Sequence, residues 1–398
     1  MSFDMTALFR PDLPAAGGRW GGYPEYSFVG GHNDGDNVPF GGLSEAAVSV
    51  LRREGSSLAS YNVGGSPQGY APLREFIAGS LESRASTPTD PEDVLVVSGS
   101  LQALDLVNGV LLESGDTVIV EMATYGGMIA RLQRLGVEVV GVHLDDDGIR
   151  SDHLGELLSD MAARGVKPKY IYTIPTVQNP TGSVMPVERR LEVLALAREH
   201  GVAIFEDDCY ADLVFDGSRP PTFRALDDGG GQVVYCGSFS KSIAPALRVG
   251  YLVADWAVLG QMMALKNDAG TGAIEQMVLA EYASSHFDDH VRQLASVLEG
   301  KCRAMTDAVT ASFGDAASFT MPKGGIFVWV TFAEGVNTGR LAKPALEAGV
   351  EFNPGAGWSA DREWGRRRLR LCFGHPSVET IRQGVGVLAD VFRDQGVI

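Results

Sequence analysis

Short apolar runs alternate with longer amphipathic stretches along the chain from about residue 93 onward. The runs are rich in β-branched residues at consecutive positions, which indicates strands that are buried on both faces of a sheet. The stretches between them have the length of helices, and the one at 186–201 ends in glycine, as helices commonly do. Strands that alternate with helices predict an α/β fold, with a mainly parallel sheet sandwiched by helices. The predicted strands are VLVVS (94–98), TVIVEM (117–122), VEVVGVHL (137–144), KYIYTIP (169–175), VAIFE (202–206), QVVYCGS (232–238) and RVGYLVA (248–254).

The pattern changes at both ends of the chain. After about residue 300 it predicts a helix, the shorter strands IFVWVTF (326–332) and RLRLCF (368–373), and a closing helix from Pro376, which form a small α+β domain. Residues 1–60 are rich in Gly and Pro and are expected to be irregular. We therefore expect an N-terminal segment over 1–60 that packs on the small domain and the substrate pocket, a large domain over 61–290, and a small C-terminal domain over 291–398.

Composition narrows the class of protein. The chain has 398 residues and a formal net charge of −17, which disfavours nucleic acids and anionic membranes as partners because both are polyanions. The N-terminus lacks a basic stretch followed by an apolar core, and no apolar run approaches the ~20 residues of a membrane span. The four cysteines are far apart without a CxxC pair, which is typical of reduced thiols in a cytoplasmic protein.

The stretch SFSKSIAPALRVGY (238–251) follows a predicted strand and places Lys241 between two serines. A lysine amine is a poor nucleophile at neutral pH because its usual pKa is ~10.4. Held as a Schiff base to the aldehyde of pyridoxal phosphate, it becomes a group that a substrate amine can displace. Ser238, Ser240 and Arg248 would supply two hydroxyls and a cation for the phosphate of this cofactor. Taken alone, an S-x-S-K stretch is as readily a polar surface turn.

The stretch FEDDCY (205–210) follows another predicted strand, at the sheet edge where open α/β sheets bind ligands. A carboxylate from Asp207 against a pyridine nitrogen would keep that nitrogen protonated, and Tyr210 can reach the phenolic oxygen of the ring. The alternative for Asp207 is a helix N-cap, a role that Asp208 can also fill.

Three further segments follow predicted strands and offer groups to the same ligand. The sequence NPTG (179–182) is first of all a turn, and such a turn can hold the Asn179 amide against the phenolic oxygen. Ser100 and Leu101 open a helix whose N-terminal backbone N–H groups form an anion site. Tyr125 is placed to stack on a flat ring, with an ordinary core aromatic as the alternative.

Together, QGYAPLREF, SGSLQALDL, QNPTG, EDDCYADL and SFSKSIAPALRVGY resemble the fold-type I pyridoxal-phosphate enzymes. The branch is that of the class I/II aminotransferases related to 2-aminoadipate and kynurenine aminotransferases, and the resemblance runs from about Phe28 to the last helix. It implies an aspartate-aminotransferase-like fold with pyridoxal 5'-phosphate as cofactor, Lys241 as the Schiff-base lysine, Asp207 as partner of the pyridine nitrogen and Tyr125 on the ring face. The other cofactor contacts that it implies are Ser100, Leu101, Asn179, Tyr210, Ser238, Ser240 and Arg248.

The resemblance also assigns the substrate side. Arg370 matches the arginine that binds the substrate α-carboxylate through a bidentate fork, beside Asn179. Its alternative is a solvated residue that continues the basic run at 366–368. Gly30 and Gly31 match a backbone segment that lines the substrate pocket. Tyr61 resembles a tyrosine that family members lend across a dimer interface to the neighbouring phosphate, which implies a homodimer with shared active sites.

The sequence departs from the family pattern mainly on the substrate side. FVGG continues as His32, Asn33 and Asp34, where relatives usually read GGxP. These residue types also occur as metal ligands, but no second cluster accompanies them, so we expect a pocket loop and no metal. Arg10 and Arg19 lie in a Gly- and Pro-rich region, where relatives that accept long acidic side chains carry an arginine on a helix.

Other departures are smaller. The loop between Tyr61 and Gly69 is longer than is usual in the family, Leu101 stands where glutamine is common, and Arg368 stands where asparagine is usual. Because the cofactor residues are kept while the substrate residues differ, we expect a specialised substrate.

The predicted reaction is the transfer of an amino group between an amino acid, or an amino-acid-like metabolite, and a 2-oxo acid. It would follow a ping-pong mechanism with Lys241 as general base. Since one carbanion serves several outcomes, the alternative is a lyase that catalyses β-elimination, or a decarboxylating or oxidatively deaminating enzyme. A third reading, a ligand-sensing regulator, requires a winged-helix module ahead of this domain; the family pattern begins at Phe28 and the charge opposes DNA binding.

Overall fold

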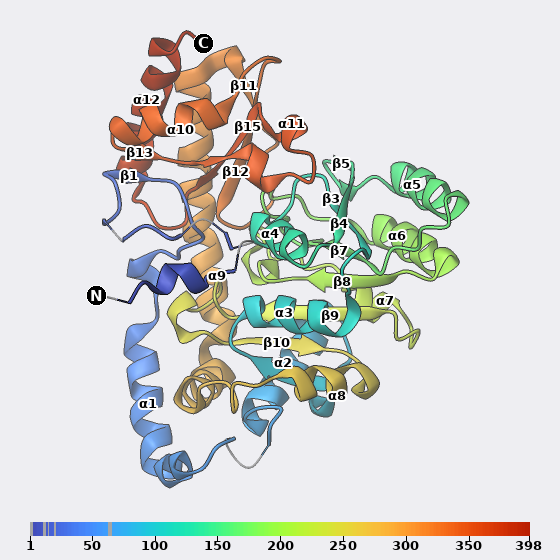
Figure 1. The fold of residues 1–398 in the computed structure, drawn as a ribbon. Coiled ribbons are helices and arrows are strands. Elements are labelled where there is room, and N and C mark those ends of the chain that lie inside the picture. The colour runs from blue at the N-terminus through green and yellow to red at the C-terminus, as the bar shows by residue number, and fades with distance from the viewer. Residues whose placement is uncertain (1–2, 11–12, 15, 20, 63–65) are drawn as a thin grey trace.

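The central sheet follows the predicted alternation of strands and helices. This computed structural model describes residues 3–10, 13–14, 16–19, 21–62 and 66–398. Among these residues a seven-stranded sheet has the order β2-β10-β9-β8-β7-β3-β4 (Figure 1). Only β10 runs antiparallel to its neighbours in the described sheet, which confirms the mainly parallel α/β fold. The strands are β2 (Val94–Val97), β3 (Thr117–Glu121), β4 (Glu138–Val142), β7 (Tyr170–Thr173), β8 (Ala203–Asp207), β9 (Val233–Ser238) and β10 (Gly250–Val253), with a small β5 (Leu144–Asp145) and β6 (Gly148–Ile149) pair at one side.

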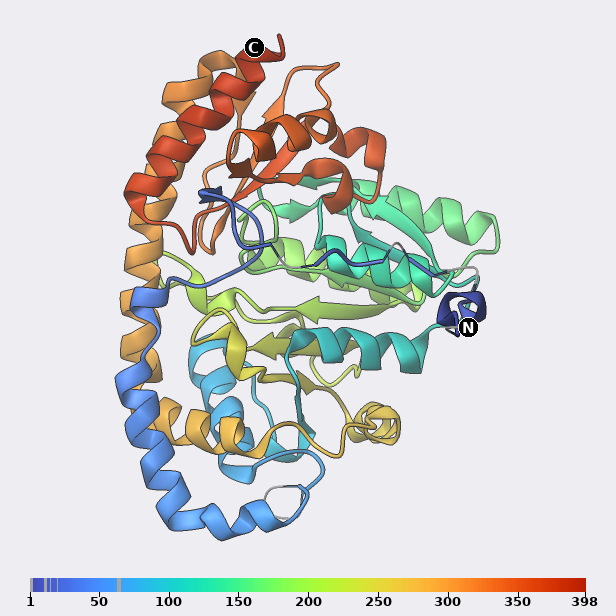
Figure 2. The ribbon, with the colours of Figure 1, turned by 60° about the vertical axis from the view of Figure 1, so that its left-hand side comes forward.

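Helices cover both faces of this sheet (Figures 1 and 2). Successive side chains of a strand point to opposite faces, so each strand feeds two cores. In β2, Leu95 and Val97 pack in the core with α3, α4 and α8, whereas Val94 and Val96 pack with α1, α2 and the first half of α9. The helices are α1 (Phe40–Glu54), α2 (Ala71–Ala85), α3 (Ser100–Leu111), α4 (Gly126–Arg134), α5 (Ser151–Ala163), α6 (Val187–His200), α7 (Phe223–Leu226), α8 (Trp256–Leu265) and α9 (Ala273–Phe313).

Helix α9 joins the sheet region to the C-terminal part. It has 41 residues, which corresponds to a length of ~60 Å, and Figure 2 shows it running along one side of the molecule. The predicted domain boundary at 290/291 falls inside this helix, and the division into domains stays a prediction. Beyond it, β12 and β15 form the centre of an antiparallel sheet of order β11-β12-β15-β14. The C-terminal elements are β11 (Ala317–Ser318), β12 (Phe327–Phe332), α10 (Thr338–Glu347), β13 (Val350–Glu351), β14 (Asn353–Pro354), α11 (Arg362–Gly365), β15 (Arg368–Cys372) and α12 (Val378–Asp394).

The N-terminal segment is tied to this C-terminal part. Strand β1 (Tyr26–Ser27) pairs in parallel with β13, and the backbone N–H of Cys372 donates to the carbonyl of Phe28 at 2.8 Å. The expectation that residues 1–60 are irregular was wrong for α1. Leu43, Ala46 and Val50 recur at steps of three and four, which makes an apolar helical stripe that the Gly and Pro content of the wider segment obscured.

The helices in the described part of the chain differ in length or hydropathy from membrane-crossing helices. None of its helices combines the length and the apolar character that crossing a bilayer requires.

Candidate active site

One cavity of about 530 Å³ lies where the carboxyl ends of β3, β7, β8 and β9 meet. Parallel strands end at the same edge of the sheet, so residues far apart in the sequence come together there. The N-terminal segment and the C-terminal sheet close the cavity from the other side. Its predicted residues are Gly30, Gly31, Ser100, Leu101, Tyr125, Asn179, Asp207, Tyr210, Ser238, Ser240, Lys241, Arg248 and Arg370.

Lys241 lines this cavity from the turn that follows β9. Its Nζ donates to the carbonyl of Gly31 at 2.5 Å and lies 5.8 Å from the ring centroid of Tyr210. Burial lowers the pKa of the Lys241 amine below its usual value, because a charged ammonium loses hydration there. A larger share of the amine is therefore neutral and nucleophilic than in a solvated lysine.

Asp207 ends β8 with its carboxylate in the cavity wall. The hydroxyl of Tyr172 donates to Oδ2 at 2.6 Å, and the backbone N–H of Cys209 donates to Oδ1 at 3.4 Å. Burial raises the pKa of Asp207, while these hydrogen bonds oppose the rise. A cationic partner would complete the site, because a buried carboxylate is stable only when it is paired.

Asp208 and Asp207 have different hydrogen-bond partners. Oδ2 of Asp208 accepts hydrogen bonds from Arg219 at 3.0 Å and from the hydroxyl of Tyr235 at 3.2 Å. The short helical turn that follows has Tyr210 at its N-cap and no side-chain cap. The suggestion that Asp208 caps a helix was therefore wrong, since its charge is used by the buried Arg219 instead.

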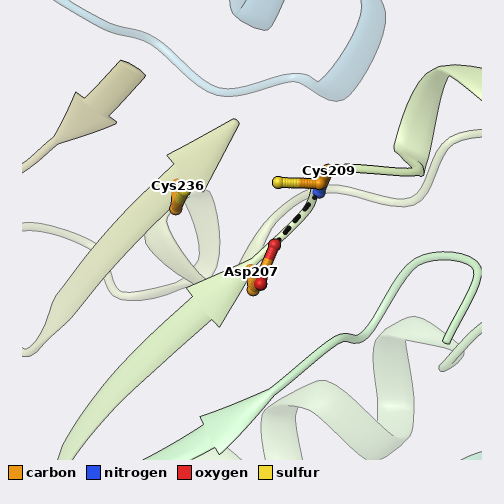
Figure 3. A group of neighbouring side chains, drawn as sticks. All are labelled: Asp207, Cys209 and Cys236. Carbon is orange, nitrogen blue, oxygen red and sulfur yellow. Dashed lines mark hydrogen bonds between the residues drawn. The ribbon is translucent and has the colours of Figure 1, made fainter. Parts of the chain in front are cut away.

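Two thiols lie beside the carboxylate of Asp207. Figure 3 shows Asp207, Cys209 and Cys236, whose ligand atoms lie within 4.8 Å of one another. A hydrogen bond with Cys236, together with burial, raises the pKa of the Cys209 thiol well above its usual value. The backbone N–H of Cys209 donates to the carboxylate of Asp207 at 3.4 Å, so this group helps to hold that carboxylate in place.

The groups expected to bind a phosphate gather at the N-terminus of α3. The hydroxyls of Ser238 and Ser240 lie 3.0 Å apart, and Arg248 reaches toward Ser240 at 3.5 Å and the carbonyl of Ser98 at 3.1 Å. Gly99, with φ of +75°, leaves room for this arginine, because a Cβ there would lie 2.3 Å from its Nη2. The hydrogen bonds of Arg248 in the described chain go to the Ser240 hydroxyl and to two backbone carbonyls rather than to a carboxylate, so the helix end and the guanidinium form a site for an anion.

Arg370 is enclosed by two aromatic rings. Its guanidinium carbon lies 3.9 Å from the ring centroid of Phe327 and 3.4 Å from that of Trp358. Its terminal nitrogens donate to Asn179 at 3.1 Å, to the carbonyl of Gly30 at 2.8 Å and to Asn353 at 2.7 Å.

The charge of Arg370 is not balanced by these contacts. The residue is 2% exposed, and its Nε has no hydrogen-bond partner among the described residues. Burial lowers the pKa of Arg370 to about 10, which keeps it charged at neutral pH. A buried cation held by amides and carbonyls, with one unused donor, fits an incoming carboxylate. The alternative of a solvated arginine is wrong.

Several contributors to the cavity were not predicted from the sequence. Phe327 was placed on a strand but without a role, and Asn353 and Trp358 follow no motif. Tyr172 was likewise seen only as a strand residue. These residues can be recognised only in the folded structure, because each one contacts Arg370 or Asp207 there.

Other residues singled out in the sequence lie elsewhere. Tyr61 is 83% exposed and does not line the cavity of its own chain. Arg10 and Arg19 do not line it either, and Arg368 packs on Trp364 with its guanidinium carbon 3.4 Å from the ring centroid. The centre of the long loop, residues 63–65, and four positions of the N-terminal region, 11–12, 15 and 20, lie outside the described residues.

Comparison with known proteins agrees with this geometry. Residues 34–388 match the family model for aminotransferase class I and II, and the chain belongs to that family. It is 32% identical over 372 residues to the aromatic-amino-acid aminotransferase 1 of Thermococcus litoralis, covering 93% of this chain and 88% of that protein.

Two solved structures extend the comparison. The multiple substrate aminotransferase of Thermococcus profundus superposes with a TM-score of 0.87 at 33% identity, covering 93% of this chain and 92% of that one. The α-aminoadipate aminotransferase of Thermus thermophilus, complexed with N-(5'-phosphopyridoxyl)-L-leucine, superposes with a TM-score of 0.85 at 33% identity. The match covers 94% of this chain and 93% of that one. The aspartate-aminotransferase-like fold, the pyridoxal-phosphate cofactor and the aminotransferase activity predicted from the sequence are thereby confirmed.

Proposed function

We propose that Lys241 holds pyridoxal phosphate covalently, with the ring nitrogen against Asp207 and the phosphate between the N-terminus of α3 and Arg248. The observation that supports this most strongly is that Lys241, the buried carboxylate of Asp207 and the guanidinium of Arg248 come from separate parts of the chain to line one cavity, where burial lowers the pKa of the lysine. Ser100, the Leu101 N–H, Ser238 and Ser240 would bind the phosphate, and Asn179, Tyr210 and Tyr125 the ring and its phenolic oxygen. The bound cofactor supplies an electron sink for the substrate carbon next to the amine.

The protein's own groups would then position the substrate and move its proton. Arg370 binds the α-carboxylate, with Asn179 and the backbone of Gly31 beside it. The substrate amine would displace Lys241 from the cofactor, and the freed amine, whose pKa burial lowers, would take the proton from the substrate α-carbon as general base. Asp207 would hold its charge against the ring nitrogen, and the two half-reactions would follow one another in ping-pong order.

The cavity favours amino acids with aromatic or apolar side chains. Its cations, in the described part of the chain, are Lys241, Arg248 and Arg370, and each already has a role. A second substrate carboxylate would be left buried without a partner, which is costly. Tyr125, Phe327 and Trp358 present aromatic surface instead. A relative named as an aromatic-amino-acid aminotransferase supports the same class.

The test is a panel of amino donors with a 2-oxo acid acceptor. We expect acceptor-dependent amino transfer from phenylalanine or leucine to be about 10-fold or more faster, in kcat/KM, than from 2-aminoadipate, because an unpaired buried carboxylate costs at least 1.4 kcal/mol. Release of ammonia with a cleaved side chain in the absence of acceptor would contradict transfer and support the lyase. Faster reaction with 2-aminoadipate would contradict the proposed substrate class.

Arg370→Ala is expected to raise KM for the amino acid about 100-fold with a smaller change in kcat, since a charge-assisted bidentate contact contributes about 3 kcal/mol. The matched control is Arg366→Ala, whose arginine is exposed and pairs only with Glu363 among its recorded ion pairs in the described chain. Steady-state kinetics check both variants. An unchanged KM in Arg370→Ala would show that the carboxylate binds elsewhere.

A homodimer and a cytoplasmic location are also proposed. Phe40, Val48 and Leu51 lie on one side of α1, are 73%, 49% and 41% exposed, and face away from the core contacts of Ala46 and Val50. A second copy would cover this stripe and bring its Tyr61 toward the neighbouring site. The four cysteines are free and buried, in keeping with a reducing compartment. A monomer mass by light scattering would contradict the dimer.

A further inference from the structure

The turn that carries Lys241 is held from outside by side chains of other elements. Three consecutive carbonyls, those of Lys241, Ser242 and Ile243, accept hydrogen bonds from side chains distant in sequence. The one from Ser242 accepts from Nε2 of His290 on α9 at 2.8 Å. The other two accept from the same group, the side-chain amide of Asn33.

The side-chain nitrogen Nδ2 of Asn33 lies within hydrogen-bond distance of two carbonyl oxygens of this turn. The nitrogen lies 3.1 Å from the carbonyl oxygen of Lys241 and 3.3 Å from that of Ile243. No other donor to these two oxygens is recorded in the described chain, where the turn's own N–H groups of Ile243 and Ala244 bond back to Phe239. These two hydrogen bonds are partly buried, so the amide of Asn33 supplies the carbonyls with a partner that the turn does not supply itself.

The loop that presents Asn33 is itself anchored on two sides. The next residue, Asp34, forms a buried ion pair with Lys301 of α9 at 2.7 Å, and Lys301 also donates to the carbonyl of Gly374 at 3.1 Å. The carbonyl of Asn33 accepts from Nδ1 of His375 at 3.2 Å. Gly374 and His375 follow the strand β15 that carries Arg370. The loop is therefore fixed to α9 and to the Arg370 side of the cavity.

We infer that Asn33 is a positioning residue for Lys241, which fixes the backbone of the lysine and joins it to the substrate-side loop at Gly31. The inference rests on the proposed role of Lys241. A lysine has a long flexible stem, so the place of its amine depends on how firmly the main chain beneath it is held. A displacement of about 1 Å at a reacting group can cost about 100-fold in rate.

The test uses two near-isosteric changes, Asn33→Leu and Asn33→Asp. The first removes both donors, and the second sets an acceptor against two carbonyl acceptors. We expect kcat to fall about 10- to 100-fold in both, with KM for the amino acid within a few-fold of wild type. In the protein without cofactor, we expect faster amide hydrogen exchange in residues 239–244 and slower formation of the borohydride-trapped link to pyridoxal phosphate.

The matched control is Asn337→Leu, which removes a side-chain hydrogen bond at the N-cap of α10, far from Lys241 in the sequence and outside the cavity. Wild-type exchange and kcat in Asn33→Leu, or a wild-type Asn33→Asp beside an impaired Asn33→Leu, would overturn the inference. If wild-type protein forms no trapped link at Lys241, the proposed function fails first. If it does and both Asn33 variants match the control, only the role of Asn33 fails.

Discussion

Lys241→Ala is expected to lower kcat for amino transfer by about 10⁴-fold, the upper end of what a positioned general base contributes. The change removes the amine that lies 2.5 Å from the carbonyl of Gly31 in the cavity. No other lysine lines that cavity in the described chain, so no neighbour can take over the proton transfer. Single-turnover rates with the amino acid, measured on protein loaded with cofactor, check the prediction.

The control for this change is Lys343→Ala. Lys343 is 86% exposed and lies 3.8 Å from Glu347 on the surface of α10, so its loss is expected to leave kcat within two-fold of wild type. Lys241→Ala should keep its thermal unfolding temperature near that of wild type without cofactor, because a buried amine with a lowered pKa adds little to stability. Retention of more than a few per cent of kcat in Lys241→Ala would contradict its role as the base.

Asp207→Asn is expected to lower kcat by about 10²- to 10³-fold, the usual loss when one preorganised electrostatic group is removed from an active site. The variant keeps the size of the side chain and one acceptor oxygen, which can serve the N–H of Cys209 or the hydroxyl of Tyr172, but it cannot keep a ring nitrogen protonated. Rapid-mixing absorbance measurements of proton removal from the α-carbon check this, because the step depends on the ring as an electron sink.

The variant Asp208→Asn serves as a control, because it removes a buried carboxylate next to Asp207 that does not line the cavity. Its side chain is fully buried against Arg219, which keeps Asp212 at 3.3 Å as a second partner. We expect this variant to lose about 2–3 kcal/mol of the free energy of unfolding, somewhat below the usual cost of breaking a buried pair, and to keep its kcat at low temperature. Urea denaturation and kinetics together measure the difference. Equal loss of kcat in Asp207→Asn and Asp208→Asn would contradict the assignment of the ring partner to Asp207.

The residues that we propose for the cofactor could be predicted to lie together, because they follow strands in short segments. Parallel strands end at one edge, so Asp207 after one strand and Lys241 after another must lie near each other. Ser100 and Asn179 also follow strands, so they are expected at the same edge of the sheet. Local chemistry and strand order together are enough to predict that these residues line one cavity, as they do.

The substrate end could not be predicted in the same way. The aromatic rings around Arg370 come from β12 and from a turn after β14, and no local pattern pairs Phe327 with Trp358. The role of Asn33 depends on a contact across 208 residues of sequence. Such contacts arise from tertiary packing, which propensity and periodicity do not encode. Helix α1 was missed for a different reason. Its apolar stripe at Leu43, Ala46 and Val50 was present in the sequence, but the Gly and Pro content of the wider segment obscured it.

The most direct test of the central claim is to reduce the protein with borohydride after adding pyridoxal phosphate and to map the modified peptide by mass spectrometry. The account predicts one stable addition of the reduced cofactor per chain, on the ε-nitrogen of Lys241. Addition to another lysine, or no addition to protein that has taken up the cofactor, would contradict it.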